Sequence, residues 1–75
     1  MDFEEFKQEF LIACDFIEEP VLAEDTELDK IPDFDSLAML GVIVMLETQF
    51  GITASGDDVM RLSTMGGLHK FATKQ

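Results

Sequence analysis

Ser36 stands where a predicted loop meets an apolar segment, and its hydroxyl is a candidate for chemistry. Asp35 and Ser36 precede the apolar residues 37–50 and offer an N-cap to a helix there. The first N–H groups of a helix have no partner within the helix, so an anion attached to Ser36 would be stabilised. Capping alone is the commoner role of such a serine. The residue type therefore leaves two roles open: a cap, or an attachment point.

The other candidate residues do not form a catalytic pattern. Cys14, the single cysteine, lies beside the apolar stripe of a predicted helix, which favours a buried structural thiol over a reactive one. His69 is the only histidine, and we expect it on a helix surface because no Ser-His or Cys-His spacing supports catalysis. Asp57 and Asp58 fit helix-start charges better than a general acid/base pair. We expect no catalytic residue and no enzymatic activity.

The acid-rich segment before Ser36 invites comparison with a calcium-binding loop. Acids fall at positions 1, 3, 5 and 9 counted from residue 25 (Asp25, Glu27, Asp29 and Asp33). An EF-hand also needs Gly at position 6 and Glu at position 12, where this chain has Lys30 and Ser36. We therefore expect no dedicated metal site, only weak binding of divalent cations that stabilises the fold.

The charge of the chain is strongly negative and uneven. Its 75 residues include 16 acids and 5 Lys or Arg, for a formal charge of -11. Residues 1–35 hold 13 acids and 2 lysines (2 − 13 = −11), whereas residues 36–75 hold 3 acids and 3 basic residues (3 − 3 = 0). Nucleic acids and anionic lipids bind through Lys and Arg, so neither is an expected partner. Proteins with basic surfaces are the expected partners.

Length and composition predict one soluble domain over residues 1–75. A hydrophobic fraction of 47% is too high for a disordered acidic tail, and a single cysteine excludes an internal disulfide framework. The acidic start lacks the basic region of a signal peptide, and the longest apolar run, residues 37–46, is too short to span a bilayer. We expect a cytoplasmic monomer without membrane insertion.

Hydrophobic periodicity predicts helices and no strand. A stripe at spacings of 3 and 4 predicts a first helix over residues 2–18 (Phe3, Phe6, Phe10, Ala13 and Ile17). An acidic loop over residues 19–35 follows, and four of its apolar residues should reach the core (Val21, Leu22, Leu28 and Ile31). Residues 37–50 form a second helix that ends before Gly51, Ser55 begins a short third, and Ser63-Thr64 begins the fourth. The predicted fold class is all-α: a small four-helix bundle, three longer helices plus one short, with a long loop between helices 1 and 2.

The second predicted helix is apolar on nearly every side, with Glu47 as its only charged residue. One set of its residues could face the core (Leu37, Leu40, Val44 and Phe50). The remaining apolar residues then spread over other faces (Met39, Val42, Met45 and Leu46). A small bundle cannot hide all of them, so the helix is central, or presents part of its surface to partners, or does both.

Residues 32–37, Pro-Asp-Phe-Asp-Ser-Leu, resemble the motif of acyl carrier proteins, in which Asp-Ser-Leu opens the second helix. The tripeptide alone is a weak signal, but its context is specific. A helix and a long acidic loop precede it, and Leu-Glu-x-x-Phe-Gly closes the second helix at residues 46–51. The short third helix and the Ser-Thr start of the fourth also match, so the resemblance covers essentially the whole chain.

The resemblance implies a freestanding carrier rather than an enzyme. In that family the serine carries 4′-phosphopantetheine, and the matching position is Ser36, flanked by Asp35 and Leu37. The arm would hold acyl groups as thioesters for enzymes of fatty-acid or polyketide biosynthesis, making the chain a phosphoprotein. Implied partners are a phosphopantetheinyl transferase and acyl-loading, synthase and transferase enzymes with basic or apolar docking patches. The expected docking residues are Leu37, Leu40, Gly41, Val44, Met45 and Glu47.

Two departures from the family pattern bear on the pathway. The family often has Gly two residues before the Asp, where this chain has Asp33. Fatty-acid carriers often bear several acids along the second helix, but here Ala38 and Gly41 stand at such positions and Glu47 is alone. We therefore expect a specialised carrier for a polyketide, modified lipid or aminoacyl pathway. Two alternatives stay open: an aminoacyl or peptidyl carrier of a nonribosomal pathway, and an unmodified acidic helical interaction module.

The uneven charge leads to a prediction for stability. A core of this size contributes only about 3–5 kcal/mol, so repulsion among the acids of residues 1–35 should weaken the fold. Added salt or divalent cations screen that repulsion. We expect the melting temperature, followed by circular dichroism, to rise when NaCl or MgCl2 is added. A melting temperature indifferent to both would contradict this expectation.

Overall fold

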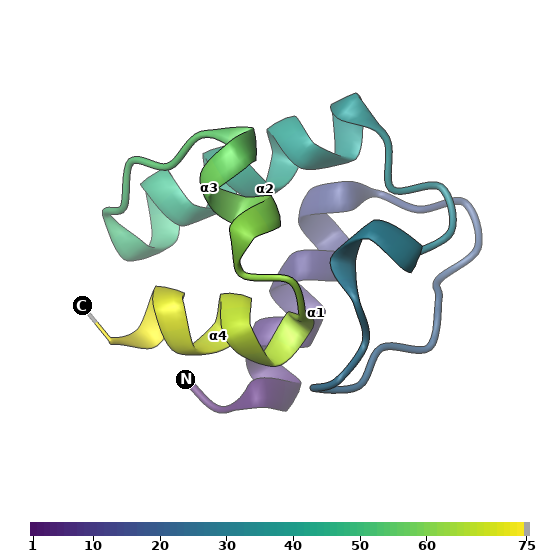
Figure 1. The fold of residues 1–75 in the computed structure, drawn as a ribbon, viewed down its shortest axis with the longest axis horizontal. Coiled ribbons are helices and arrows are strands. Elements are labelled where there is room, and N and C mark those ends of the chain that lie inside the picture. Colours follow the sequence, from purple (N-terminus) through teal and green to yellow (C-terminus); the bar gives the residue numbers. More distant parts are fainter. Residues whose placement is uncertain (75) are drawn as a thin grey trace.

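Four α-helices and one short 3-10 helix make up the regular structure in the computed structural model, which describes residues 1–74 (Figure 1). They are α1 (Phe3–Cys14), η1 (Leu28–Lys30), α2 (Ser36–Phe50), α3 (Gly56–Arg61) and α4 (Met65–Thr73). In that part of the chain no strand forms beyond an isolated bridge between Glu27 and Thr64. None of the helices described is long and apolar enough to cross a membrane. The predicted all-α bundle, with three longer helices and one short, is confirmed.

α1 begins near its predicted start but ends earlier than predicted. Asp2 caps it: the Asp2 carboxylate accepts the N–H of Glu5 at 2.9 Å, and the Glu5 carboxylate accepts the N–H of Asp2 at 3.1 Å. The helix stops at Cys14 because Asp15 adopts a left-handed conformation, with φ 52°. The prediction of a helix to residue 18 is therefore wrong. Ile17 is fully exposed and lies outside the apolar stripe.

α2 turns a different face to the core than the sequence predicts. Its buried residues are Ala38, Val42, Met45 and Leu46. Leu37, Leu40 and Val44 are 75%, 54% and 50% exposed, so the prediction that they face the core is wrong. Phe50, predicted with them, is partly buried and packs against the core. A helix that is apolar on nearly all sides carries no periodic signal to orient it, so the packing of its neighbours decides.

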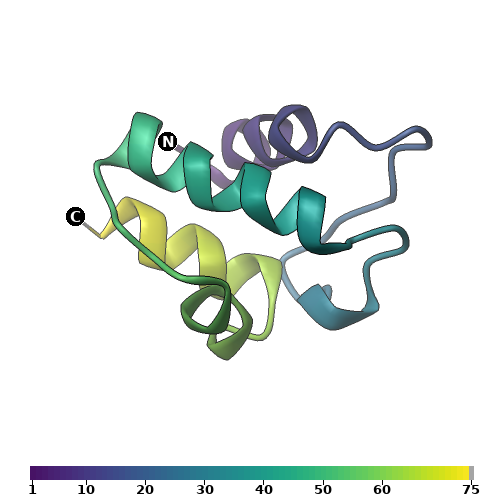
Figure 2. The ribbon, with the colours of Figure 1, turned by 90° about the horizontal axis from the view of Figure 1, so that it is seen from above.

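The orientation of α2 is set by a close contact with α1. Figure 2 shows α2 running beside α1, with α4 on its other side. Gly41 of α2 faces the backbone of Ala13, and a Cβ at position 41 would overlap the Ala13 carbonyl oxygen. The missing side chain therefore lets the two backbones meet. With Gly41 against α1, the neighbouring Val42 and Leu46 are fully buried.

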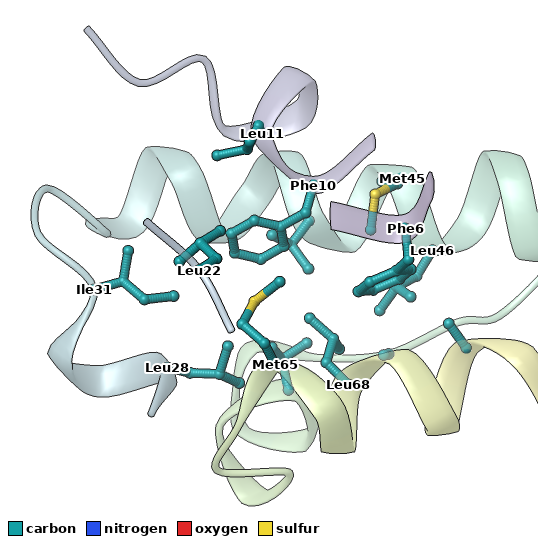
Figure 3. Packing of buried hydrophobic residues seen from close by; sticks show 14 of the residues in the cluster. Phe6, Phe10, Leu11, Leu22, Leu28, Ile31, Met45, Leu46, Met65 and Leu68 are labelled. Atoms are coloured by element: carbon teal, nitrogen blue, oxygen red, sulfur yellow. The ribbon is translucent and has the colours of Figure 1, made fainter. Parts of the chain in front are cut away.

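The core contains side chains from the helices and from the long loop (Figure 3). Phe6 and Phe10 of α1 are fully buried, as are Met65 and Leu68 of α4. The loop contributes three buried side chains, as predicted (Leu22, Leu28 and Ile31). Val21 is 95% exposed, so the prediction that it also reaches the core is wrong. It is adjacent to Leu22, and only one of the two points inward.

The loop is tied to the start of α4 by backbone hydrogen bonds. The N–H of Met65 donates to Thr26 at 2.9 Å, and the N–H of Gly66 donates to Glu24 at 2.8 Å. A Cβ at position 66 would lie 2.8 Å from the Glu24 carbonyl oxygen, so this helical glycine permits a close approach. The acidic loop is therefore a fixed part of the fold in this region.

α3 and α4 begin at the predicted caps. The Ser55 hydroxyl accepts the N–H of Asp58 at 3.2 Å, while the Asp58 carboxylate accepts the N–H of Ser55 at 3.0 Å. In α4 the Thr64 hydroxyl accepts the N–H of Gly67 at 3.1 Å. These caps use only neighbours within three residues, which is why the sequence predicts them.

His69 is half buried rather than on the helix surface that the sequence led us to expect. Its ring meets the ring of Phe3 edge-on at 5.7 Å and lies 5.4 Å from that of Phe6. Its Nε2 atom is 3.0 Å from the carbonyl oxygen of Met1. His69 thus joins the start of α1 to α4.

Gly41→Ala tests the contact between α1 and α2. Helix propensity alone predicts a gain of about 1 kcal/mol when Ala replaces Gly inside a helix. The overlap with the Ala13 carbonyl predicts the opposite, a loss of about 1–3 kcal/mol, as at other overpacked sites. Urea unfolding of the wild type and the variant measures whether the free energy of unfolding rises or falls.

Gly56→Ala is the matched control for this substitution. A Cβ at position 56 meets only the Met39 side chain, at 3.5 Å, which is ordinary contact. We expect this variant to be as stable as the wild type or more so. A stability gain in Gly41→Ala as well would contradict the proposed contact.

Candidate functional site

Ser36 is the first residue of α2, and its side chain is exposed. Asp35 supplies the helix cap, because its carboxylate accepts the N–H of Ala38 at 3.0 Å. The capping role that a serine often fills is thus taken by the preceding residue. The hydroxyl of Ser36 is not needed for it and faces solvent at the junction of loop and helix.

The chain is held in place just before Ser36. The ring of Phe34 stacks on that of Phe10 with centroids 5.8 Å apart, so the end of the loop rests on the core. Asp33 adopts φ 61°, and its carbonyl accepts the N–H of Asp35 at 3.0 Å. Glycine adopts this left-handed conformation without strain, and Asp is among the few other residues that tolerate it. This explains physically how Asp33 replaces the glycine of the family pattern.

The start of α2 favours an anion at Ser36. The N–H groups in the first turn of α2 have no partner within the helix. The Asp35 carboxylate accepts one of them, that of Ala38. The helix dipole adds partial positive charge at the same end. The carboxylates of Asp33 and Asp35 oppose an anion, but both residues are exposed, so water and salt screen the repulsion. A phosphodiester on Ser36 is compatible with these local charges.

A shallow hollow of about 440 Å³ lies beside Ser36, between the start of α2 and α3. Met39 of α2 and Met60 of α3 form its apolar wall, and Asp29 is on its polar side. Methionine side chains adapt to ligands of different shape. The hollow therefore offers an apolar surface to a flexible chain attached at Ser36. No sequence pattern links these two methionines, because they come together only in the fold.

A second hollow, of about 600 Å³, runs along the line where α1 and α2 meet, and we call it the α1–α2 groove. Leu37, Leu40 and Val44 line it from α2, and Ile12, which is 71% exposed, lines it from α1. The three α2 residues are among the docking residues expected from the sequence, whereas Ile12 is not. The available signal was that Ile12 is an apolar residue outside the stripe of the first helix.

The other expected docking residues differ in accessibility. Glu47 is exposed, and Gly41 lines the groove with its backbone against α1. Met45 is only 3% exposed, with its side chain near those of Phe6 and Leu46 (Figure 3). Met45 nevertheless also lines the groove, so its place at a docking surface stays a prediction.

Cys14 is half buried behind the start of α2. Its Sγ donates a weak hydrogen bond to the carbonyl of Ala38 at 3.7 Å. Burial, and secondarily the negative charge of Asp35, raises the pKa of the Cys14 thiol to about 12. The thiol is therefore protonated at neutral pH, which fits the structural role expected for it.

The acidic residues form no metal centre in residues 1–74. No three potential ligands among His, Cys, Asp and Glu come together there. Hydrogen bonds from Ser55, its backbone N–H first, hold the pKa of the Asp58 carboxyl below its usual value. Asp58 is thus an ionised cap of α3.

Comparison with known proteins supports the chemistry at the start of α2. The family model described as "phosphopantetheine attachment site" matches residues 12–71. The matched range runs from the end of α1 into α4 and includes Ser36. In that family the domain is the attachment site of covalent 4′-phosphopantetheine. No curated protein and no solved structure matches the chain at a significant level.

Native Cys14 should react slowly with iodoacetamide. A pKa of about 12 leaves very little thiolate at pH 8. We expect alkylation at that pH to be at least about 100-fold slower in the folded protein than in guanidinium, where the thiol regains its ordinary pKa. A mass-spectrometric time course measures both rates. Equal rates would mean that the thiol is neither buried nor perturbed.

Proposed function

The chain belongs to the family of phosphopantetheine attachment-site domains, and on this premise we propose that it is an acyl carrier protein modified on Ser36. One observation carries the choice of residue: the exposed Ser36 opens α2 while Asp35 performs the capping. Members of the family are carriers, so reactions on the cargo belong to partner enzymes. A phosphopantetheinyl transferase and synthase enzymes are partners of such domains.

The attachment step needs an accessible hydroxyl and a phosphate donor. In the proposed step the transferase removes the proton from Ser36 Oγ, which attacks the phosphorus of coenzyme A nearest the pantetheine. A P–O bond to Ser36 forms, and the P–O bond to adenosine 3′,5′-bisphosphate breaks. The product is a phosphodiester at the start of α2, where the free N–H groups favour it. When bound, the arm supplies a thiol that holds acyl groups as thioesters.

The residues around Ser36 position this attachment point. Asp35 fixes the first turn of α2, and Phe34, stacked on Phe10, anchors the end of the loop. Met39 and Met60 offer an apolar surface on which the arm can rest beside the helix. The point of attachment is thus rigid, while the arm itself stays flexible and can deliver its cargo to an enzyme.

The pathway proposal rests on the composition of α2. Glu47 is its only acid, whereas fatty-acid carriers often have several. Ala38 is 3% exposed and Gly41 touches the backbone of α1, so neither position could present an acid to a partner without disturbing the packing. These constraints support a specialised carrier for a polyketide, modified lipid or aminoacyl pathway. Efficient loading and elongation by standard fatty-acid synthase enzymes would refute this part of the proposal.

Incubation with coenzyme A and a broad-specificity phosphopantetheinyl transferase tests the choice of Ser36. We expect intact mass spectrometry to show a gain of one phosphopantetheine in the wild type and none in Ser36→Ala. Ser55→Ala is the matched control, because Ser55 also stands at a helix start but serves as the cap of α3. It should gain the arm like the wild type.

Two results would contradict the proposal. Modification of Ser36→Ala would place the arm on another residue. No modification of the wild type, by a transferase active on a reference carrier, would favour the unmodified acidic interaction module.

A further inference from the structure

The hollow beside Ser36 combines an apolar wall with two carboxylates. Met39 and Met60 form the wall, while Asp29 and Asp35 carry the charges. Ligand sites in proteins have this mixture, in which apolar contacts supply most of the surface and a few polar groups set the specificity. Ser36, the proposed attachment point of the arm, lines the same hollow, so a group carried by the arm comes within reach of it.

The two carboxylates of the hollow are not neutralised by basic side chains in the described part of the chain. Lys30, the neighbour of Asp29 in sequence, pairs instead with Glu27 at 3.2 Å, and no Lys or Arg lines the hollow. Asp35 caps α2 through its Oδ1 atom, which leaves Oδ2 for a ligand. A positively charged group placed here would therefore be attracted by two carboxylates, whereas a negatively charged group would be repelled by both.

The size of the hollow suits a short group rather than a long chain. Its volume of about 440 Å³ lies near the small end of the range for ligand sites, about 300–1,000 Å³. Toward α3 the Met39 side chain closes the gap between the helices, because a Cβ built at Gly56 would lie 3.5 Å from Met39 Cγ. Methionine side chains adapt to small differences in shape, so several short groups would fit.

We propose that this hollow selects the cargo of the arm, and that the cargo is a short acyl group with a positively charged amino group. The ammonium pairs with Asp29 and Asp35, and the carbon chain lies against Met39 and Met60. A cargo that ends in a carboxylate is rejected by repulsion, and a long neutral chain by the size of the hollow. The inference rests on the proposed modification of Ser36 and narrows the candidate pathways to those that carry amino-bearing acyl groups.

The flexible arm makes a weak contact sufficient. Asp29 and Asp35 are exposed, so water and salt screen their attraction for an ammonium. Attachment at Ser36 holds the cargo near the hollow at an effective concentration of about a millimolar, as expected for a short flexible tether. A site of that strength is occupied for part of the time and still leaves the cargo free to reach an enzyme.

Protein loaded with matched cargos tests the proposal. A broad-specificity phosphopantetheinyl transferase attaches arms from coenzyme A analogues in which a stable amide replaces the thioester. The arms end in β-alanyl, butyryl or succinyl, which differ mainly in terminal charge, or in acetyl as the reference. We expect the amide NMR shifts of Asp29, Met39 and Met60, measured against the acetyl form, to be at least threefold larger for β-alanyl than for butyryl or succinyl. Added NaCl should reduce the β-alanyl shifts.

Asp29→Asn removes one carboxylate while keeping the size of the side chain. We expect the β-alanyl shifts at Met39 and Met60 to fall at least threefold in this variant. Asp25→Asn is the matched control, because Asp25 is also exposed in the loop and loses the same charge but does not line the hollow. Its shifts should equal those of the wild type. Equal shifts for β-alanyl and butyryl, or equal losses in the two variants, would overturn the proposal.

A titration of the unmodified protein separates this inference from the proposed function. The ligand is the free pantetheine amide analogue that carries β-alanyl, added at millimolar concentration. We expect Asp29, Met39 and Met60 to shift, and the dissociation constant to be at least threefold higher for the butyryl analogue. Failure of the transferase to modify Ser36 would contradict the carrier function, and this titration would then decide the hollow alone. Modification of Ser36 without any preference for β-alanyl would leave the carrier function standing and overturn the assignment of the cargo.

Discussion

The close contact between α1 and α2 at Gly41 is the constraint on which the rest of the structure depends. Because the backbone of Ala13 occupies the space where a Cβ would lie, only glycine fits there without movement of the helices. This contact directs Val42 and Leu46 inward and leaves Leu37 and Leu40 exposed. One steric contact thus decides both which residues of an almost uniformly apolar helix form the core and which remain on the surface near Ser36.

At the start of α2, one residue caps the helix and the next one offers a free hydroxyl. Asp35 satisfies a backbone N–H group, and the adjacent Ser36 hydroxyl remains exposed. The acids that give the chain its charge of -11 lie in α1 and the loop, whereas α2 itself is nearly neutral. Under the proposed carrier function, a basic partner would be attracted by these acids and would contact the exposed apolar residues of α2.

Local interactions explain what the sequence predicts correctly. Asp35, Gly51, Ser55 and Thr64 act at the helix ends within a few residues, so their roles can be inferred from the chain alone. The end of α1 was predicted too late because the left-handed conformation of Asp15 outweighs the apolar spacing of Ile17.

Contacts between distant segments explain what could not be predicted. The inward face of α2 depends on Gly41 meeting Ala13, which α2's own pattern does not encode. Burial of Met45 follows from the same packing. The candidate attachment serine could be identified from its motif, but the groove could not, because Ile12 and Leu40 meet only in the folded chain.

The most direct test of the central claim is fragmentation mass spectrometry of the protein after transfer of the arm. The account predicts phosphopantetheine on Ser36 alone; its presence on Ser55, Ser63 or any other residue would contradict it.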